Sequence, residues 1–133
     1  MATSDLGFVH GYSAFAVKDI DAAKAFYGDV LGLQVSDRMM GLIAVQLPGG
    51  TEVLVYPKPD HVPATYTILN LVTDDIDLSA DELTARGVEL LRYEGFEQDD
   101  TGIARGNGPA IAWFTDPSGN ILAVLQDSSS PSS

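Results

Sequence analysis

The sequence contains no cysteine. This absence excludes disulfide bonds, thiolate catalysis, cysteine-ligated zinc sites and iron–sulfur clusters. Basic residues are also few, since 7 lysine and arginine residues stand against 19 aspartate and glutamate residues, for a formal net charge of −12. No basic stripe is available to meet phosphate groups, so neither nucleic acid nor an anionic membrane is expected as a partner.

Long apolar runs are missing as well. No stretch approaches the roughly 18 residues that a membrane-spanning helix needs. The first residues, MATSDLGFVHG, lack the basic and apolar regions of a signal peptide. A chain of 133 residues with 45% hydrophobic content fits one globular domain, and we expect it in the cytoplasm.

The first half of the chain predicts one strand, one helix and three further strands. Asp19 or Asp21 can cap the helix, and Gly32 suits its end. Gly28 within the helix costs about 1 kcal/mol relative to alanine, with no local reason for its presence. The expected strands are Gly11–Val17, Leu33–Ser36, Leu42–Leu47 and Thr51–Tyr56.

The same order recurs after a proline-rich connector, residues 58–64. The sequence V-K-D-I-D at 17–21 matches T-D-D-I-D at 73–77, and both precede a predicted helix. Two copies are too few for a solenoid, so two βαβββ modules are the better interpretation. Module one spans residues 9–57, module two spans 65–127, and 128–133 is expected to be a flexible tail. The second module's strands are predicted at Tyr66–Val72, Val88–Tyr93 and the two arms of a hairpin.

That hairpin is the stretch WFTDPSGNILAV, from Trp113 to Val124. Asp, Pro and Gly at the first, second and fourth positions of Asp-Pro-Ser-Gly are typical of a tight turn. Before it, residues 94–109 form the one long irregular segment, with Phe96 and Ile103 as apolar anchors and Arg105 among glycines. Such a loop is usually a lid or binding element, or else disordered.

Three motifs in this order carry a resemblance: V-x-D-I at 17–20, F-Y-x-x-V-L-G at 26–32 and D-P-x-G-N at 116–120. The chain resembles the vicinal oxygen chelate superfamily of glyoxalases, bleomycin-resistance proteins and extradiol dioxygenases. The resemblance extends from about Gly11 to Gln126. It implies an α+β fold in which two βαβββ modules form an open, cup-like mixed sheet, usually as a homodimer.

Enzymes of this superfamily hold a divalent metal through one ligand from each of four strands. The resemblance places these positions at Tyr12, Val53, Ile68 and Ala123. None of the four is a good ligand, since three lack a donor and a neutral phenol binds metals poorly. His10 and Glu52 lie close to two of the positions, but Tyr66–Val72 offers no histidine, aspartate or glutamate. We therefore expect no metal and no other cofactor.

The cup that the resemblance implies would have an apolar, partly aromatic lining, typical of small-molecule sites. The residues predicted to bind a ligand are Tyr12, Ala14, Ile68, Asn70, Phe96, Trp113 and Ala123. Simpler roles exist for some of them: Trp113 can pack in the core or an interface, and Tyr12 can bond a backbone carbonyl. No catalytic residue is predicted. His10 and His61 are expected to be solvated loop residues.

Four functions remain open on the sequence. The favoured one is a metal-free protein, similar to the bleomycin-resistance branch, that sequesters a hydrophobic or aromatic molecule in the cup. The alternative is a metal-dependent lyase, isomerase or dioxygenase with an atypical ligand set. An enzyme without metal would lack groups for general acid–base catalysis, because Tyr12 and Asn70 are the only polar residues expected on the inner faces. A purely structural or partner-binding module is the fourth.

Overall fold

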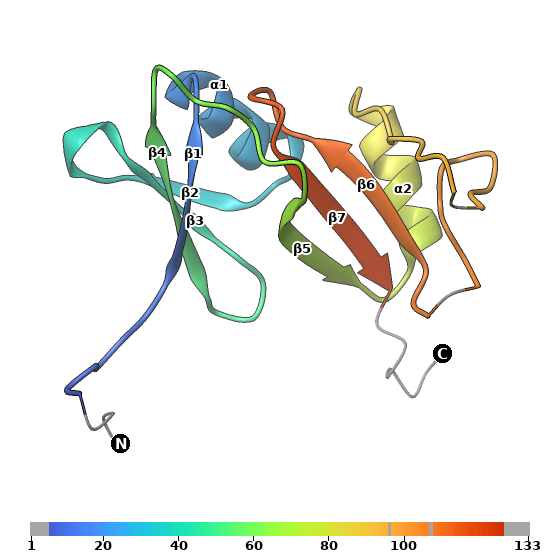
Figure 1. Cartoon of the computed structure of the whole chain (residues 1–133), viewed down its shortest axis with the longest axis horizontal. Helices are drawn as coiled ribbons and strands as arrows, with labels where there is room; N and C mark the ends of the chain where they lie inside the picture. The colour runs from blue at the N-terminus through green and yellow to red at the C-terminus, as the bar shows by residue number, and fades with distance from the viewer. Residues whose placement is uncertain (1–5, 96, 107, 127–133) are drawn as a thin grey trace. The chain divides into compact units, whose positions relative to one another are not determined.

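The computed structural model describes residues 6–95, 97–106 and 108–126. The chain forms two compact units, Met1–His61 and Val62–Ser133, and each is described by itself. Each unit contains one β-sheet and one helical segment (Figure 1). The predicted α+β fold is confirmed: two βαβββ-like modules form open mixed sheets.

The first unit contains a four-stranded sheet in the order β1-β4-β3-β2. Its strands are β1 (Ser13–Val17), β2 (Gln34–Asp37), β3 (Ile43–Gln46) and β4 (Glu52–Pro57). β1 pairs with β4 in parallel, and the other two pairs are antiparallel. A short 3₁₀ turn, η2 (Met39–Gly41), separates β2 from β3. All four predicted strands are confirmed, with small shifts at their ends.

The helical segment of this unit is α1 (Ile20–Lys24) followed by a π-helical stretch, η1 (Ala25–Val30). Asp19 is the cap, because its carboxylate accepts hydrogen bonds from the backbone N–H groups of Asp21 and Ala22 at 3.0 and 3.2 Å. A uniform α-helix was the wrong prediction for the second half. The wider turn there buries two successive aromatic side chains, Phe26 and Tyr27, with their rings edge to face at 5.2 Å.

The helical segment covers one face of the first sheet. Phe15 lies on that face, with its ring 5.7 Å from the ring of Tyr27. Side chains alternate along each strand, and residues directly opposite on neighbouring strands share a face. The other face is the open face of the first sheet, formed by Ala14, Ala16, Gln34, Ser36, Ala44, Gln46, Glu52, Leu54 and Tyr56.

The second unit contains a three-stranded sheet in the order β5-β7-β6. Its elements are β5 (Thr67–Thr73), α2 (Ile76–Ala85), β6 (Ile111–Thr115) and β7 (Ile121–Gln126). β5 pairs with β7 in parallel, and β6 and β7 form the predicted hairpin. Asp116 closes its turn, since the backbone N–H of Gly119 donates to the Asp116 carbonyl at 2.9 Å. Gly119 has a φ of +89°, which explains the glycine at this position.

Helix α2 packs on β7 and covers one face of this sheet (Figure 1). Asp75 caps it by accepting a hydrogen bond from the Leu78 N–H at 3.2 Å. The side chain of Gln126, on β7, accepts a second one from the Ile76 N–H at 3.0 Å. The face under the helix carries the core of the unit, with Phe114 and Leu122 fully buried.

The predicted strand Val88–Tyr93 is not formed. The Leu91 N–H donates to the Trp113 carbonyl at 2.7 Å, so this segment lies beside β6. Gln98 engages two more of its backbone groups, since the Gln98 side chain accepts from the Tyr93 N–H at 2.8 Å and donates to the Leu91 carbonyl at 2.9 Å. A side chain thus replaces the ladder that a further strand would provide.

The described part of the long loop is a hydrogen-bonded turn organised by Asp99. One oxygen of its carboxylate, Oδ1, accepts from the backbone N–H groups of Thr101, Gly102 and Ile103. Arg105 joins this turn to α2, because its guanidinium pairs with Asp99 at 3.2 Å and with Asp77 at 2.6 Å. Phe96 and the predicted tail, 128–133, lie outside the described residues.

Candidate functional site

Three of the predicted ligand-binding residues come together on the second sheet. Asn70 of β5 and Trp113 of β6 stand directly opposite Ala123 of the central strand β7. The three side chains therefore form one row, on the face away from α2. We call this the open face of the second sheet. Its next row is Val72, Leu125 and Ile111.

Side chains on this face differ sharply in exposure. Ala123 is fully buried, Trp113 is half-buried and Asn70 is exposed. The Trp113 ring is held edge to face by Tyr93, with centroids 5.1 Å apart. The Asn70 amide has no hydrogen-bond partner among the described residues. The row thus places an aromatic ring, a small residue and an exposed amide side by side.

Ile68 lies beside this row at an irregularity of β5. The register with β7 shifts between Thr67 and Leu69, which places Ile68 in a bulge. Its side chain is half-buried. Phe96, the remaining predicted ligand residue of this unit, lies outside the described residues.

Tyr12 and Ala14 belong to the first unit. Ala14 lies on β1 opposite Leu54, on the open face of the first sheet. Tyr12 directly precedes β1, is 60% exposed, and has its ring 6.0 Å from that of His10. No hydrogen bond to a backbone carbonyl is found for Tyr12 among the described residues.

The third metal position that the resemblance suggested, Val53, lies on the wrong face of its strand. Val53 is 3% exposed, and it pairs with Val45 on the face covered by the helical segment. The residue of β4 that reaches the open face is its neighbour Glu52. Because E-V-L-V-Y is almost continuously apolar, the sequence carried no alternation that could decide between them.

Glu52 is part of a polar network that sequence reasoning missed. Its Oε2 atom accepts hydrogen bonds from Arg38 at 2.8 Å and from Gln46 at 2.7 Å. Arg38 also donates to the Ser36 hydroxyl at 2.9 Å. The sequence Q-V-S-D-R could have indicated this network. Gln34, Ser36 and Arg38 are polar and occupy every second position, so in an extended chain their side chains lie on the same face.

The donor set does not fit a metal ion of the kind the superfamily enzymes hold. Among residues 6–95, 97–106 and 108–126, no group of three histidine, aspartate or glutamate side chains is arranged to hold one. Tyr12, Ile68 and Ala123 offer a phenol and two hydrocarbon side chains. Glu52, on the open face of the first sheet, is paired with Arg38.

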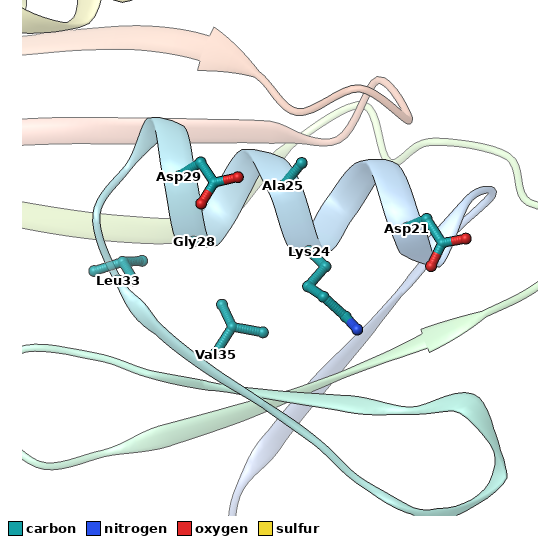
Figure 2. Close-up of a pocket in the computed structure, with 7 residues that line it drawn as sticks. All are labelled: Asp21, Lys24, Ala25, Gly28, Asp29, Leu33 and Val35. Carbon is teal, nitrogen blue, oxygen red and sulfur yellow. The ribbon is translucent and has the colours of Figure 1, made fainter.

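A groove of about 560 Å³ lies elsewhere, beside the helical segment of the first unit. Figure 2 shows its lining: Asp21, Lys24, Ala25, Gly28, Asp29, Leu33 and Val35. Gly28 forms part of the lining, and a β-carbon there would lie in ordinary van der Waals contact with Val35 Cγ2, at 3.5 Å. The hydrogen bond from Lys24 to Asp37, with their charge attraction, raises the pKa of Lys24. This groove contains none of the predicted ligand residues.

Comparison with known proteins identifies the family. Residues 10–124 match the model of the Glyoxalase/Bleomycin resistance protein/Dioxygenase superfamily. The chain belongs to this superfamily. No curated protein matches the chain. Among the described residues, no helix combines the length and apolar character needed to cross a bilayer.

Solved structures of the superfamily resemble the chain over most of its length. A superfamily member from Sphaerobacter thermophilus is 26% identical, with a TM-score of 0.65 over 90% of this chain and 98% of that one. TnmS3, an antibiotic binding protein from Streptomyces, has the same identity, TM-score and coverage. A putative glyoxalase family protein from Bacillus anthracis is 18% identical, with a TM-score of 0.67 over 90% of this chain and 97% of that one, which shows the fold alone.

Proposed function

We propose that this protein binds a small hydrophobic or aromatic molecule, without a metal ion, on the open face of the second sheet. The observation that carries the proposal is the row Asn70–Ala123–Trp113. An aromatic ring, a small residue that leaves room and a free amide are the parts of a typical small-molecule site. The role that follows is sequestration of the compound rather than its conversion.

Likeness to TnmS3 supports the proposal. That protein, described as antibiotic binding, shares 26% of its residues with the chain and is covered over 98% of its length. The face in question is also suited to an aromatic compound, because Tyr93 holds the Trp113 ring in a fixed orientation. An acidic net charge of −12 favours neutral or cationic ligands over anionic ones.

The competing function is a metal-dependent enzyme with an atypical ligand set. His10 and Glu52 are its candidate ligands, and Glu52 would have to give up its pairing with Arg38. Metal analysis of protein purified without a histidine tag separates the two functions. A stoichiometric divalent metal would contradict our proposal, and protein without one that still binds aromatic compounds would support it.

The proposal is tested with the chain's single tryptophan. Titration with a panel of polycyclic aromatic antibiotics is expected to change Trp113 fluorescence for at least one of them. Asn70→Ala is expected to weaken binding of that compound about tenfold, because it removes a hydrogen bond that the bound compound would shield from water. Leu78→Ala is the control, since Leu78 is 61% exposed on α2. The proposal would be contradicted if no compound of the panel changed Trp113 fluorescence, or if both variants bound the compound equally well.

We also propose that two copies of the chain form a homodimer through the segment before β1. Leu6, Phe8 and Val9 expose 80%, 65% and 79% of their surface, an apolar run that a second copy would cover. Sedimentation is expected to show a dimer at micromolar concentration, and Phe8→Glu to shift it toward monomer. Val62→Glu, at an equally exposed apolar position, should leave it dimeric. A monomeric wild-type protein would contradict the proposal.

A further inference from the structure

Two residues that line the groove beside the helical segment are unfavourable for the helix itself. Gly28 lies inside η1, and glycine is the least favourable residue after proline in a helix interior. Asp29 follows it near the end of η1, where a negative charge opposes the helix dipole. A helix end of this composition needs a reason other than helix stability, and such exceptions are expected at functional sites.

Packing does not supply the reason for Gly28. Its backbone is not among the positive-φ glycines of the chain, so any residue can adopt its conformation. A β-carbon there would meet Val35 Cγ2 at 3.5 Å, an ordinary van der Waals distance. Alanine would therefore fit without strain and would favour the helix. What alanine would change is the groove, because its methyl group would occupy space beside Val35.

The groove has an apolar floor between two carboxylates. Leu33 and Val35 contribute half-buried side chains to the floor, beside Gly28. Asp21 and Asp29 lie two turns apart on the helical segment, toward opposite ends of the lining (Figure 2). Among the described residues, neither carboxylate accepts a hydrogen bond or forms an ion pair at contact distance. Both carboxylates are therefore available to a ligand.

Lys24, the basic residue of the lining, is engaged elsewhere. Its ammonium group pairs with Asp37 at 2.7 Å, and Asp37 does not line the groove. Asp21 makes only a smaller contribution to the charge attraction that Lys24 experiences. The methylene stem of a lysine adds apolar surface where it lies along a groove. The lining therefore keeps negative charge at both ends and apolar surface between them.

We infer that this groove binds an aliphatic chain with an ammonium group at each end, as in a long diamine or a polyamine. One ammonium group lies at Asp21 and the other at Asp29, and the methylene groups lie over Gly28 and Val35. Eight residues of helix advance by up to about 12 Å, so the two carboxylates cannot share one cation but can hold the two ends of such a chain. The net charge of −12 attracts this ligand from a distance. The inference does not rest on the function proposed above.

The inference is tested by NMR titration of the full chain at low ionic strength with 1,8-diaminooctane and 8-amino-1-octanol, which differ in one ammonium group. The diamine is expected to shift the amide signals of residues 20–37 and to bind about threefold tighter, as for one additional exposed ion pair. Equal binding of the two compounds would overturn the inference. Shifts spread over the acidic surface, without a maximum at residues 20–37, would overturn it as well.

Gly28→Ala separates the groove from the stability of the fold. The variant is expected to bind 1,8-diaminooctane at least about threefold more weakly, because the methyl group takes the place of the ligand chain. Its melting temperature should stay the same or rise. Gly11→Ala is the matched control, since a β-carbon at Gly11 would meet nothing within 4 Å, and it should bind as the wild type. A lower melting temperature, or an unchanged affinity, in Gly28→Ala would overturn the inference.

Asp29→Asn separates a specific site from general charge attraction. It removes one of the two charged ends, so the preference for 1,8-diaminooctane over 8-amino-1-octanol is expected to disappear. Asp81→Asn makes the same change of net charge at an exposed position of α2 and should retain the preference. Equal effects of the two variants would show that only the net charge matters, and would overturn the inference.

Discussion

Asp116→Ala is expected to lower the free energy of unfolding by about 3 kcal/mol and the melting temperature by roughly 10 °C. Asp116 is 3% exposed in the turn between β6 and β7. Its carboxylate accepts from the backbone N–H groups of Ser118 and Asn120, both at 2.9 Å, and from the Asn120 side chain at 3.0 Å. Alanine leaves these donors without their acceptor, and Asn120 is itself buried.

Thermal and urea denaturation measure this effect, with two controls. Asp116→Asn keeps an oxygen for the backbone donors but faces the Asn120 amide with a second NH₂ group, so it should lose less stability than alanine. Asp81→Ala removes an exposed carboxylate from α2 and should change stability by less than about 0.5 kcal/mol. Wild-type stability in Asp116→Ala would show that the turn forms without its carboxylate.

Asp99→Ala is expected to cost about 2 kcal/mol at neutral pH, because the carboxylate organises the turn of residues 99–105. Oδ1 accepts from three backbone N–H groups and from the Thr101 hydroxyl, and Oδ2 accepts from Arg105. Partial burial raises the pKa of Asp99, but these hydrogen bonds outweigh it and lower the pKa to about 2.

A pKa below the usual 3.8 makes this contribution dependent on pH. The ionised form is favoured by folding, so the stabilisation is complete above about pH 4 and is lost as the pH falls through 2. The loss should be about 1 kcal/mol, less than the shift alone implies, because the side chain is 37% exposed and screened. Denaturation at pH 5 and pH 2 should show a smaller drop for Asp99→Asn than for the wild type. Asp100→Asn should behave as the wild type, and an equal drop in all three would contradict the assignment.

Local signals in the sequence predicted the fold well. Asp19 and Asp75 cap their helices, and the Asp-Pro-Ser-Gly turn joins two strands, because each depends on residues close in the chain. Asn70, Trp113 and Ala123 were predicted as ligand-binding residues, and the register of their three strands places them in one row.

Two predicted elements differ from the structure because side-chain contacts and burial outweigh the local preference. The segment Val88–Tyr93 has the composition of a strand, yet the Gln98 side chain bonds the Tyr93 N–H and the Leu91 carbonyl in place of a neighbouring strand. The helix after Asp19 widens into a π-helix, where Phe26 and Tyr27 are both buried. In each case the preference of the local sequence is smaller than the gain from a contact or burial formed elsewhere in the unit.

The sequence by itself determined the superfamily, the two modules and the absence of a donor at Ile68 and Ala123, two of the four strand positions where the superfamily's enzymes bind metal. These follow from residue identity and from short spacings. Only the tertiary structure decided that Glu52, and not Val53, reaches the open face of the first sheet, and that Arg38 and Gln46 hold it there. The physical reason is register. β4 is almost uniformly apolar, so its sequence does not indicate which of its faces is covered. Its pairing with β3, beneath the helical segment, determines that face.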